Sequence, residues 1–152
     1  MALAGRRLCA VAALLAVCLG VGCSSAPYYR WPVELGVQSA DSLNKDMPVA
    51  VEVAYVYDPS LTDTLASMSA SKWFQRRQDL AWRHPDGFEW WRWEWTPGQS
   101  VSSKALPMVF FTRSVFVFAG YRSSGTHRTK APPFRPLQLE LNRTNLQVRV
   151  SP

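Results

Sequence analysis

The stretch that decides the fold is Val49-Ala-Val-Glu-Val-Ala-Tyr-Val-Tyr57. Every second residue is large and apolar, and the residues between them are Ala50, Glu52, Ala54 and Val56. A period of two places successive side chains on opposite faces of an extended chain. The pattern therefore predicts a β-strand, which Asp58-Pro59 ends.

A second alternating segment precedes this one. From Pro32, the apolar residues Val33, Leu35 and Val37 alternate with Glu34, Gly36 and Gln38 and predict another half-buried strand. Between the two strands, residues 41–48 are rich in turn formers. The sequence thus predicts two strands joined by a polar loop.

A helical segment follows the central strand. Residues 61–83 contain no Gly or Pro, and their large apolar residues recur at helical spacing. Ser69 or Ser71 is suited to cap a helix within this range, and Arg83-His84-Pro85 to end it. One or two short helices are therefore expected after the second strand.

The next segment, Phe88-Glu-Trp-Trp-Arg-Trp-Glu-Trp95, is the most aromatic of the chain. Alternation places Trp91, Trp93 and Trp95 on one face of a predicted strand and Phe88 and Trp90 on the other. Large rings of this kind normally belong to a core. An exposed cluster would instead form a platform for a glycan or another partner.

The C-terminal part predicts further β-structure. Residues 106–113 and 114–122 are apolar, residues 123–133 form a polar loop, and residues 137–141 and 146–150 alternate as a hairpin. The total is about seven strands with mostly short connections. The predicted fold is mainly β, a two-sheet β-sandwich with a short helical insertion after the second strand.

The N-terminus has the pattern of a bacterial lipoprotein signal peptide. Arg6 and Arg7 precede an apolar stretch from Leu8 to Leu19, which is too short to span a bilayer. Gly20-Val-Gly-Cys23 then fits a lipobox, with Gly20 in the place usually held by Leu. Cys23 is the predicted lipidation site. The alternative is an ordinary secretory signal cleaved near Ala26.

Composition limits the function classes. The chain has three cysteines, Cys9, Cys18 and Cys23, so the predicted exported domain has none for a disulfide or a redox pair. The formal net charge is +6, with no run of basic residues. This mild excess favours a solvated surface, and no nucleic-acid partner is expected.

Candidate chemistry is sparse. His84 and His127 are far apart in sequence, and neither shows the spacing of metal ligands. Glu89 and Glu94 are five positions apart, which puts them on opposite faces of a strand. The sequence therefore predicts no catalytic residue, no metal and no cofactor, although distant segments could still form an active site.

The order of these features resembles the TssJ lipoproteins of bacterial type VI secretion systems. In that family, Leu-Asn and an acidic residue precede a Pro-led strand that ends in Tyr. A Pro-Gly turn and an Ala-x-Tyr-Arg segment come later. The matching segments here are Leu43-Asn-Lys-Asp46, Pro48–Tyr57, Pro97-Gly98 and Ala119-Gly-Tyr-Arg122.

The resemblance implies a transthyretin-like β-sandwich with an added helical piece, held in the outer membrane by acyl chains and facing the periplasm. It also implies a large inner-membrane partner, TssM, bound through its periplasmic region, and no small-molecule substrate. The loop between the first two strands, Asp41–Pro48, would be a main contact, with Asn44, Lys45 and Asp46 at its tip. The partner-binding residues would be Asn44, Lys45, Asp46 and Met47.

These inferences define three segments. Residues 1–22 are the predicted signal peptide, residues 23–31 a lipidated tether, and residues 32–152 the β-sandwich domain. The principal hypothesis is a non-enzymatic lipoprotein that anchors a secretion complex. The alternative is an envelope lipoprotein that binds peptidoglycan or another glycan through the Trp-rich strand, and an enzyme is a third possibility.

Overall fold

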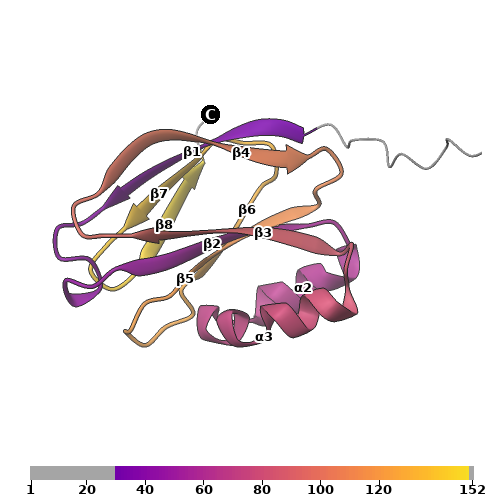
Figure 1. Cartoon of the computed structure of the whole chain (residues 1–152), viewed down its shortest axis with the longest axis horizontal. Coiled ribbons are helices and arrows are strands. Elements are labelled where there is room, and N and C mark those ends of the chain that lie inside the picture. Colours follow the sequence, from indigo (N-terminus) through magenta and orange to yellow (C-terminus); the bar gives the residue numbers. More distant parts are fainter. Residues whose placement is uncertain (1–29, 151–152) are drawn as a thin grey trace, which may run out of the picture.

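The computed structural model describes residues 30–150, so the predicted signal peptide, Cys23 and most of the predicted tether lie outside the described residues. Figure 1 shows two layers of strands with helices on one side. In chain order, the elements are β1 (Arg30–Ser39), η1 (Leu43–Lys45), β2 (Val49–Val56), α2 (Pro59–Ser67), α3 (Ala70–Arg83), β3 (Phe88–Trp95), β4 (Ser100–Val109), β5 (Ser114–Ala119), β6 (Arg128–Ala131), β7 (Leu137–Leu141) and β8 (Leu146–Val150).

The described strands form two four-stranded sheets. The first has the order β4-β1-β7-β8 and the second the order β3-β2-β5-β6. All neighbours are antiparallel except β1 and β7, which are parallel. The predicted two-sheet β-sandwich with a helical insertion after the second strand is confirmed.

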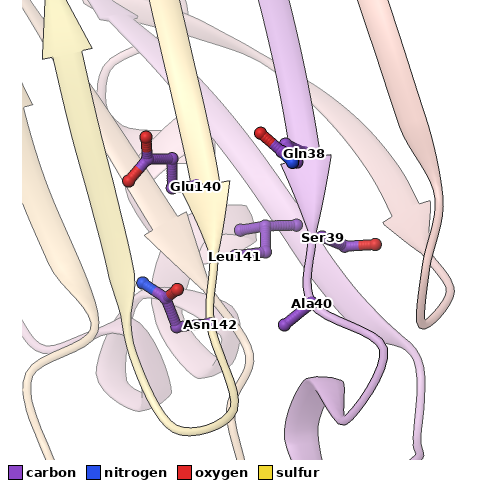
Figure 2. A pocket seen from close by; sticks show the side chains of 6 residues that line it. All are labelled: Gln38, Ser39, Ala40, Glu140, Leu141 and Asn142. Atoms are coloured by element: carbon purple, nitrogen blue, oxygen red, sulfur yellow. The ribbon is translucent and has the colours of Figure 1, made fainter.

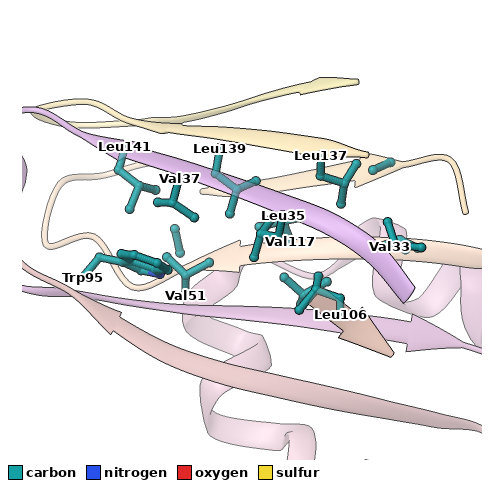
Figure 3. Close-up of a cluster of buried hydrophobic side chains, with 14 of the residues drawn as sticks. Val33, Leu35, Val37, Val51, Trp95, Leu106, Val117, Leu137, Leu139 and Leu141 are labelled. Atoms are coloured by element: carbon teal, nitrogen blue, oxygen red, sulfur yellow. The ribbon is translucent and has the colours of Figure 1, made fainter. Parts of the chain in front are cut away.

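The main hydrophobic core lies between the two sheets, as Figure 3 shows. Inward-facing residues of β1, β2, β5 and β7 meet there with Trp95 of β3. Its fully buried members include Leu35, Val51, Val117 and Leu139. Burying a side chain of this size stabilises the folded state by about 1.5–3 kcal/mol, so alternation in these strands fixes which faces meet.

Strand β2 is buried on both faces because α2 and α3 cover the outer face of its sheet (Figure 1). The outward residues Ala54 and Val56 pack with Leu65 and Trp73 of the helices. The Trp73 ring stacks on that of Phe118, with ring centroids 4.6 Å apart. The sequence therefore builds a three-layer structure of sheet, sheet and helices.

Glu52 is an exception in this second core. Its carboxylate has no exposed surface and accepts a hydrogen bond from Trp73 Nε1 at 2.7 Å. Arg77 Nε lies 3.2 Å from the same oxygen, and Arg92 approaches the other oxygen at 3.5 Å. Burial raises the pKa of Glu52, while the bond from Trp73 and the two arginines act in the opposite direction. This buried charge fastens α3 to the sheet.

The helix boundaries follow local capping. Asp58 accepts a hydrogen bond from the backbone N–H of Ser60 and caps α2, and Pro59 occupies the first turn. Ser69 accepts from the N–H of Lys72 and caps α3, which ends before His84. Of the expected one or two short helices, the structure has two, and of the two cap candidates Ser69 is the N-cap of α3.

Three parts of the β-structure differ from the expectation. Strand β1 begins at Arg30, two residues before Pro32. Strand β4 begins at Ser100, although its first half is polar and exposed at an edge of the sheet. The predicted loop 123–133 contains β6, whose Arg128-Thr-Lys-Ala131 sequence lacks an apolar face but pairs with β5. Backbone pairing, rather than side-chain pattern, forms these pieces.

Among residues 30–150, no helix is both long enough and apolar enough to cross a membrane.

Candidate functional site

The predicted contact loop lies at one end of the sandwich, where β1 ends and β2 begins. Figure 1 shows this end at the left, where the β7–β8 turn and the connection from β5 to β6 also lie. The loop begins after Ser39 and ends before Val49. It is presented by two strands that lie in different sheets and are both packed into the core.

The backbone of the loop is tightly folded. Asn44, Lys45 and Asp46 have φ angles of 46°, 59° and 62°, which is the left-handed region. Asn and Asp tolerate this region better than other non-glycine residues, whereas Lys at this position costs about 1–2 kcal/mol. Leu43 anchors the loop with a fully buried side chain, and the N–H of Met47 donates to its carbonyl. The surrounding packing holds a strained shape.

Asn44 is a structural residue of the loop. It is only 4% exposed, so the expectation that it lies at the tip with Lys45 and Asp46 is wrong. Its Nδ2 donates to Pro48 O at 3.1 Å, and its Oδ1 accepts from the Arg122 N–H at 2.9 Å. Its backbone N–H donates to Arg143 O at 3.0 Å. Because Asn44 bonds three neighbours, it joins the loop to two other segments.

Those two segments are also joined to each other. The Tyr121 hydroxyl lies 3.0 Å from Asn142 O and 2.8 Å from Asn145 O. Ser123 Oγ donates to Thr144 O at 2.8 Å. Burial raises the pKa of the Tyr121 phenol, which keeps its proton available as a donor. The loop, the segment after β5 and the β7–β8 turn therefore form one hydrogen-bonded unit.

The turn between β3 and β4 supports the base of this unit. Ser39 Oγ lies 2.7 Å from Thr96 O and 2.9 Å from Gln99 O, and the Gly98 N–H donates to Ala40 O at 3.2 Å. Gly98 has a φ of 72°, as the third residue of a Pro-Gly turn of type II requires. The expected Pro97-Gly98 turn is thus present.

The exposed part of the loop is small and chemically mixed. Lys45, Asp46 and Met47 are all exposed, and the Met47 side chain is one of the large apolar groups on the surface. We call these three residues the loop tip. A cation, an anion and a flexible apolar group on a fixed backbone are suited to recognition of a protein surface.

A shallow pocket of about 260 Å³ lies beside the loop, between the ends of β1 and β7 (Figure 2). Its lining residues are Gln38, Ser39, Ala40, Glu140, Leu141 and Asn142. Glu140 forms an ion pair with Arg149, with Oε2 and Nη2 3.1 Å apart, and Ser39 Oγ donates a hydrogen bond to Thr96 O in the neighbouring turn. These polar groups serve the fold, and the loop tip remains the better candidate for binding.

We expect Asn44→Ala to lower the free energy of unfolding by about 1–3 kcal/mol, because it leaves the Arg122 N–H and Pro48 O without their partner. Denaturant unfolding of wild type and variant measures this loss. Asp46→Ala is a matched control at an exposed position. Equal stability of Asn44→Ala and wild type would show that the bonds of Asn44 do not hold the loop.

The other residues considered for catalysis or metal binding do not form a common site in the described residues. Glu89 forms a two-point ion pair with Arg30, at 2.6 and 3.1 Å, while Glu94 lies opposite Ala50 farther along β3. His127 contacts the Tyr121 ring and Ser123, and His84 is the C-cap of α3. In the described part of the chain, no three His, Cys, Asp or Glu side chains gather as metal ligands would.

The Trp-rich strand β3 belongs to the two cores. Trp95 is buried between the sheets, and Trp91 and Trp93 pack partly buried against the same core. Trp90 packs on the other side with the helices, and its ring lies edge-on to Trp73. Lys104 of β4 covers the open side of Trp93, with its Nζ 5.3 Å from the ring centroid. The expectation of a core role is confirmed, and these rings form no open platform for a glycan.

Comparison with solved structures shows the same fold in type VI secretion proteins. The T6SS lipoprotein TssJ1 from Pseudomonas aeruginosa matches with a TM-score of 0.65 and 16% identity, over 81% of this chain and 98% of that chain. Serratia marcescens Lip, a membrane-bound component of the type VI secretion system, matches with a TM-score of 0.59 and 13% identity, over 78% and 96%.

A third match is a chain in the structure of the C-terminal domain (869–1107) of the T6SS protein TssM from EAEC. Its TM-score is 0.60 and its identity 15%, over 78% of this chain and 97% of that chain. No family model matches the sequence, and no curated protein matches it either. The resemblance to TssJ lipoproteins is therefore supported through the fold, at low sequence identity.

Proposed function

We propose that this chain is a TssJ-like outer-membrane lipoprotein of a type VI secretion membrane complex, and that it binds a TssM-like inner-membrane subunit in the periplasm. The observation that carries the proposal is the structural match over nearly the whole of TssJ1, together with the order of motifs that led to the same family from sequence. The braced loop between β1 and β2 supports a partner contact at the same place as in that family.

The proposed mechanism is a double tether. Acyl chains on Cys23 hold one end of the lipoprotein in the outer membrane, and the loop tip holds the inner-membrane subunit. Confinement at one membrane raises the effective concentration of the second contact, so a modest affinity between the soluble parts is sufficient. The role is structural and needs no catalytic residue or cofactor.

The loop tip supplies the contact because its backbone is fixed before binding. The three left-handed residues and the bonds of Asn44 hold the loop in one shape, so little conformational entropy is lost when a partner binds. Asn44 acts behind the tip and positions it. Lys45, Asp46 and Met47 make the contact, with Met47 adapting to the apolar surface of the partner.

Replacing Lys45, Asp46 and Met47 together with Ala should weaken binding to the periplasmic domain of the TssM-like subunit by about tenfold or more, because residues at the centre of an interface carry most of its energy. Titration of the detergent-solubilised lipoprotein with that purified domain measures the change. Circular dichroism should show an unchanged fold, since all three side chains are exposed.

A matched control exists on α3. Asp79, Trp82 and Arg83 are also one anion, one apolar group and one cation, and all are exposed. They lie at the opposite end of the sandwich, where α3 leads into β3. Their replacement with Ala should leave affinity unchanged. If the α3 variant weakens binding and the loop variant does not, the contact lies on the helices and the proposed loop contact is wrong.

A further inference from the structure

The end of the sandwich opposite the loop tip carries exposed aromatic side chains. Trp31 is 55% exposed, Phe110 73% and Phe134 38%. They come from β1, from the turn after β4 and from the connection between β6 and β7. Together they line an open apolar pocket of about 400 Å³. We call these three residues the aromatic end.

The fold holds these rings in place. Trp31 lies opposite Met108 in the β1–β4 pairing, and the Phe134 N–H is 3.3 Å from Met108 Sδ. Phe134 has a φ of 59°, which is unusual for a bulky residue and is maintained by its surroundings. Phe110 packs edge-on against Phe111, with ring centroids 5.7 Å apart. Apolar side chains gathered on a rigid surface mark a site of interaction.

The position of the predicted lipid anchor identifies what lies near this surface. Trp31 is the second residue of β1, and seven peptide steps from Cys23 to Arg30 reach at most about 25 Å. Strand β1 has ten residues and carries the chain about 33 Å farther to the contact loop. The aromatic end is therefore the part of the sandwich nearest the anchored membrane, and the loop tip is far from it.

We propose that the aromatic end docks into the headgroup region of the membrane that anchors the chain. Trp is suited to this interface because its ring meets acyl chains while its N–H meets water or headgroups, and the two Phe rings add apolar surface that acyl chains can bury. Exposed Arg30 and Arg135 adjoin Trp31 and Phe134 in sequence and lie within reach of lipid phosphates, Arg30 while paired with Glu89.

Docking has a consequence for the complex. A lipoprotein held by its acyl chains alone has no fixed orientation, whereas a docked sandwich points β1 away from the membrane and presents the loop tip to the periplasm. This inference rests on the lipid anchor of the proposed function, but it does not require the TssM-like partner. Membrane orientation can therefore be tested without any secretion protein.

The test uses the absence of cysteine from residues 24–152. Phe110→Cys in the full-length lipidated protein is labelled with a polarity-sensitive fluorophore and reconstituted into vesicles of phosphatidylethanolamine and phosphatidylglycerol. Met47→Cys, at the loop tip, is the matched control. We expect a several-fold rise in emission at position 110 and strong quenching there by a lipid-borne nitroxide. The label at position 47 should show neither.

Each other outcome has a definite meaning. The docking proposal is overturned if the protein co-floats with the vesicles but the label at position 110 emits as in water, like the label at position 47. The lipid anchor would then stand. If the protein does not float, the anchor and the docking are both overturned. When Trp31→Ser and Phe134→Ser are added to Phe110→Cys, the emission of the label at position 110 should fall to its value in water. Unchanged emission in that variant would also contradict docking by the aromatic end.

Discussion

Glu52→Ala is expected to lower the free energy of unfolding by about 3 kcal/mol or more, since breaking a buried ion pair by removing one partner leaves an uncompensated charge. The substitution leaves Trp73 Nε1 without its acceptor and Arg77 without its nearest anion. Arg92 adds little, because its side chain is half-exposed and solvent screens it. Denaturant unfolding, followed by tryptophan fluorescence, measures the effect.

Two further variants test whether the buried carboxylate of Glu52 is the cause of this loss of stability. Asp79→Ala removes an exposed ion pair with Arg83 on the same helix and should change stability by less than about 1 kcal/mol. Glu52→Gln keeps an oxygen that can accept from Trp73 and should cost less than Glu52→Ala. If Glu52→Ala costs no more than the Asp79 control, the buried carboxylate does not fasten α3 to the sheet.

The pKa of Glu52 also predicts a dependence on pH. Burial raises this pKa in the folded state, so between the unfolded and folded pKa values the folded protein binds more protons than the unfolded chain. The part of the stability that comes from this pKa shift is fully present below the unfolded pKa of Glu52 and is lost as pH rises through its folded pKa. The difference in the free energy of unfolding between wild type and Glu52→Gln should therefore become smaller as pH rises. A difference that grows with pH would contradict the raised pKa of Glu52.

Cys23→Ser is expected to abolish assembly of the proposed membrane complex while leaving the fold intact. Without acyl chains, the lipoprotein loses the membrane anchor and the gain in avidity that a second tether provides, which is of the order of 10²–10⁴. Fractionation of host membranes, followed by affinity purification with the TssM-like subunit, measures both losses.

Cys18→Ser is the matched control, because Cys18 lies within the predicted signal peptide and is removed with it. This variant should remain in the outer membrane and retain its partner. A fully assembled complex that contains Cys23→Ser would overturn the double-tether mechanism, and a soluble protein in both variants would indicate a failure of export.

Much of the fold could be predicted because strong periodicity coincides with strong burial. In β2, alternation from Val49 separates the residues of the central core from those under the helices. In α3, helical spacing and the Ser69 cap set where the helix begins and which side is buried. The hairpin of β7 and β8 follows from clean alternation around a polar turn. Local pattern is sufficient where each face meets one environment.

The missed elements have a common cause. Strand β6 and the first half of β4 carry polar side chains, and their hydrogen bonds to neighbouring strands form them. The parallel pairing of β1 with β7 joins segments about a hundred positions apart. No local pattern encodes such a partner. A strand at the edge of a sheet needs little apolar surface, so it leaves a weak signal in the sequence.

The features of the candidate site likewise divide into those that the sequence determined and those that only the tertiary structure decided. The sequence determined that a polar loop joins the first two strands and that Cys23 follows a lipoprotein-like leader, and it favoured a core role for the Trp-rich strand. Only the tertiary structure placed Asn44 inside, bonded to Arg122 and Arg143 from distant segments, and left Lys45, Asp46 and Met47 as the exposed tip. It also gathered the three rings of the aromatic end from separate parts of the chain. Periodicity records which face of one element is apolar, whereas the partners of a side chain depend on which elements the fold brings together.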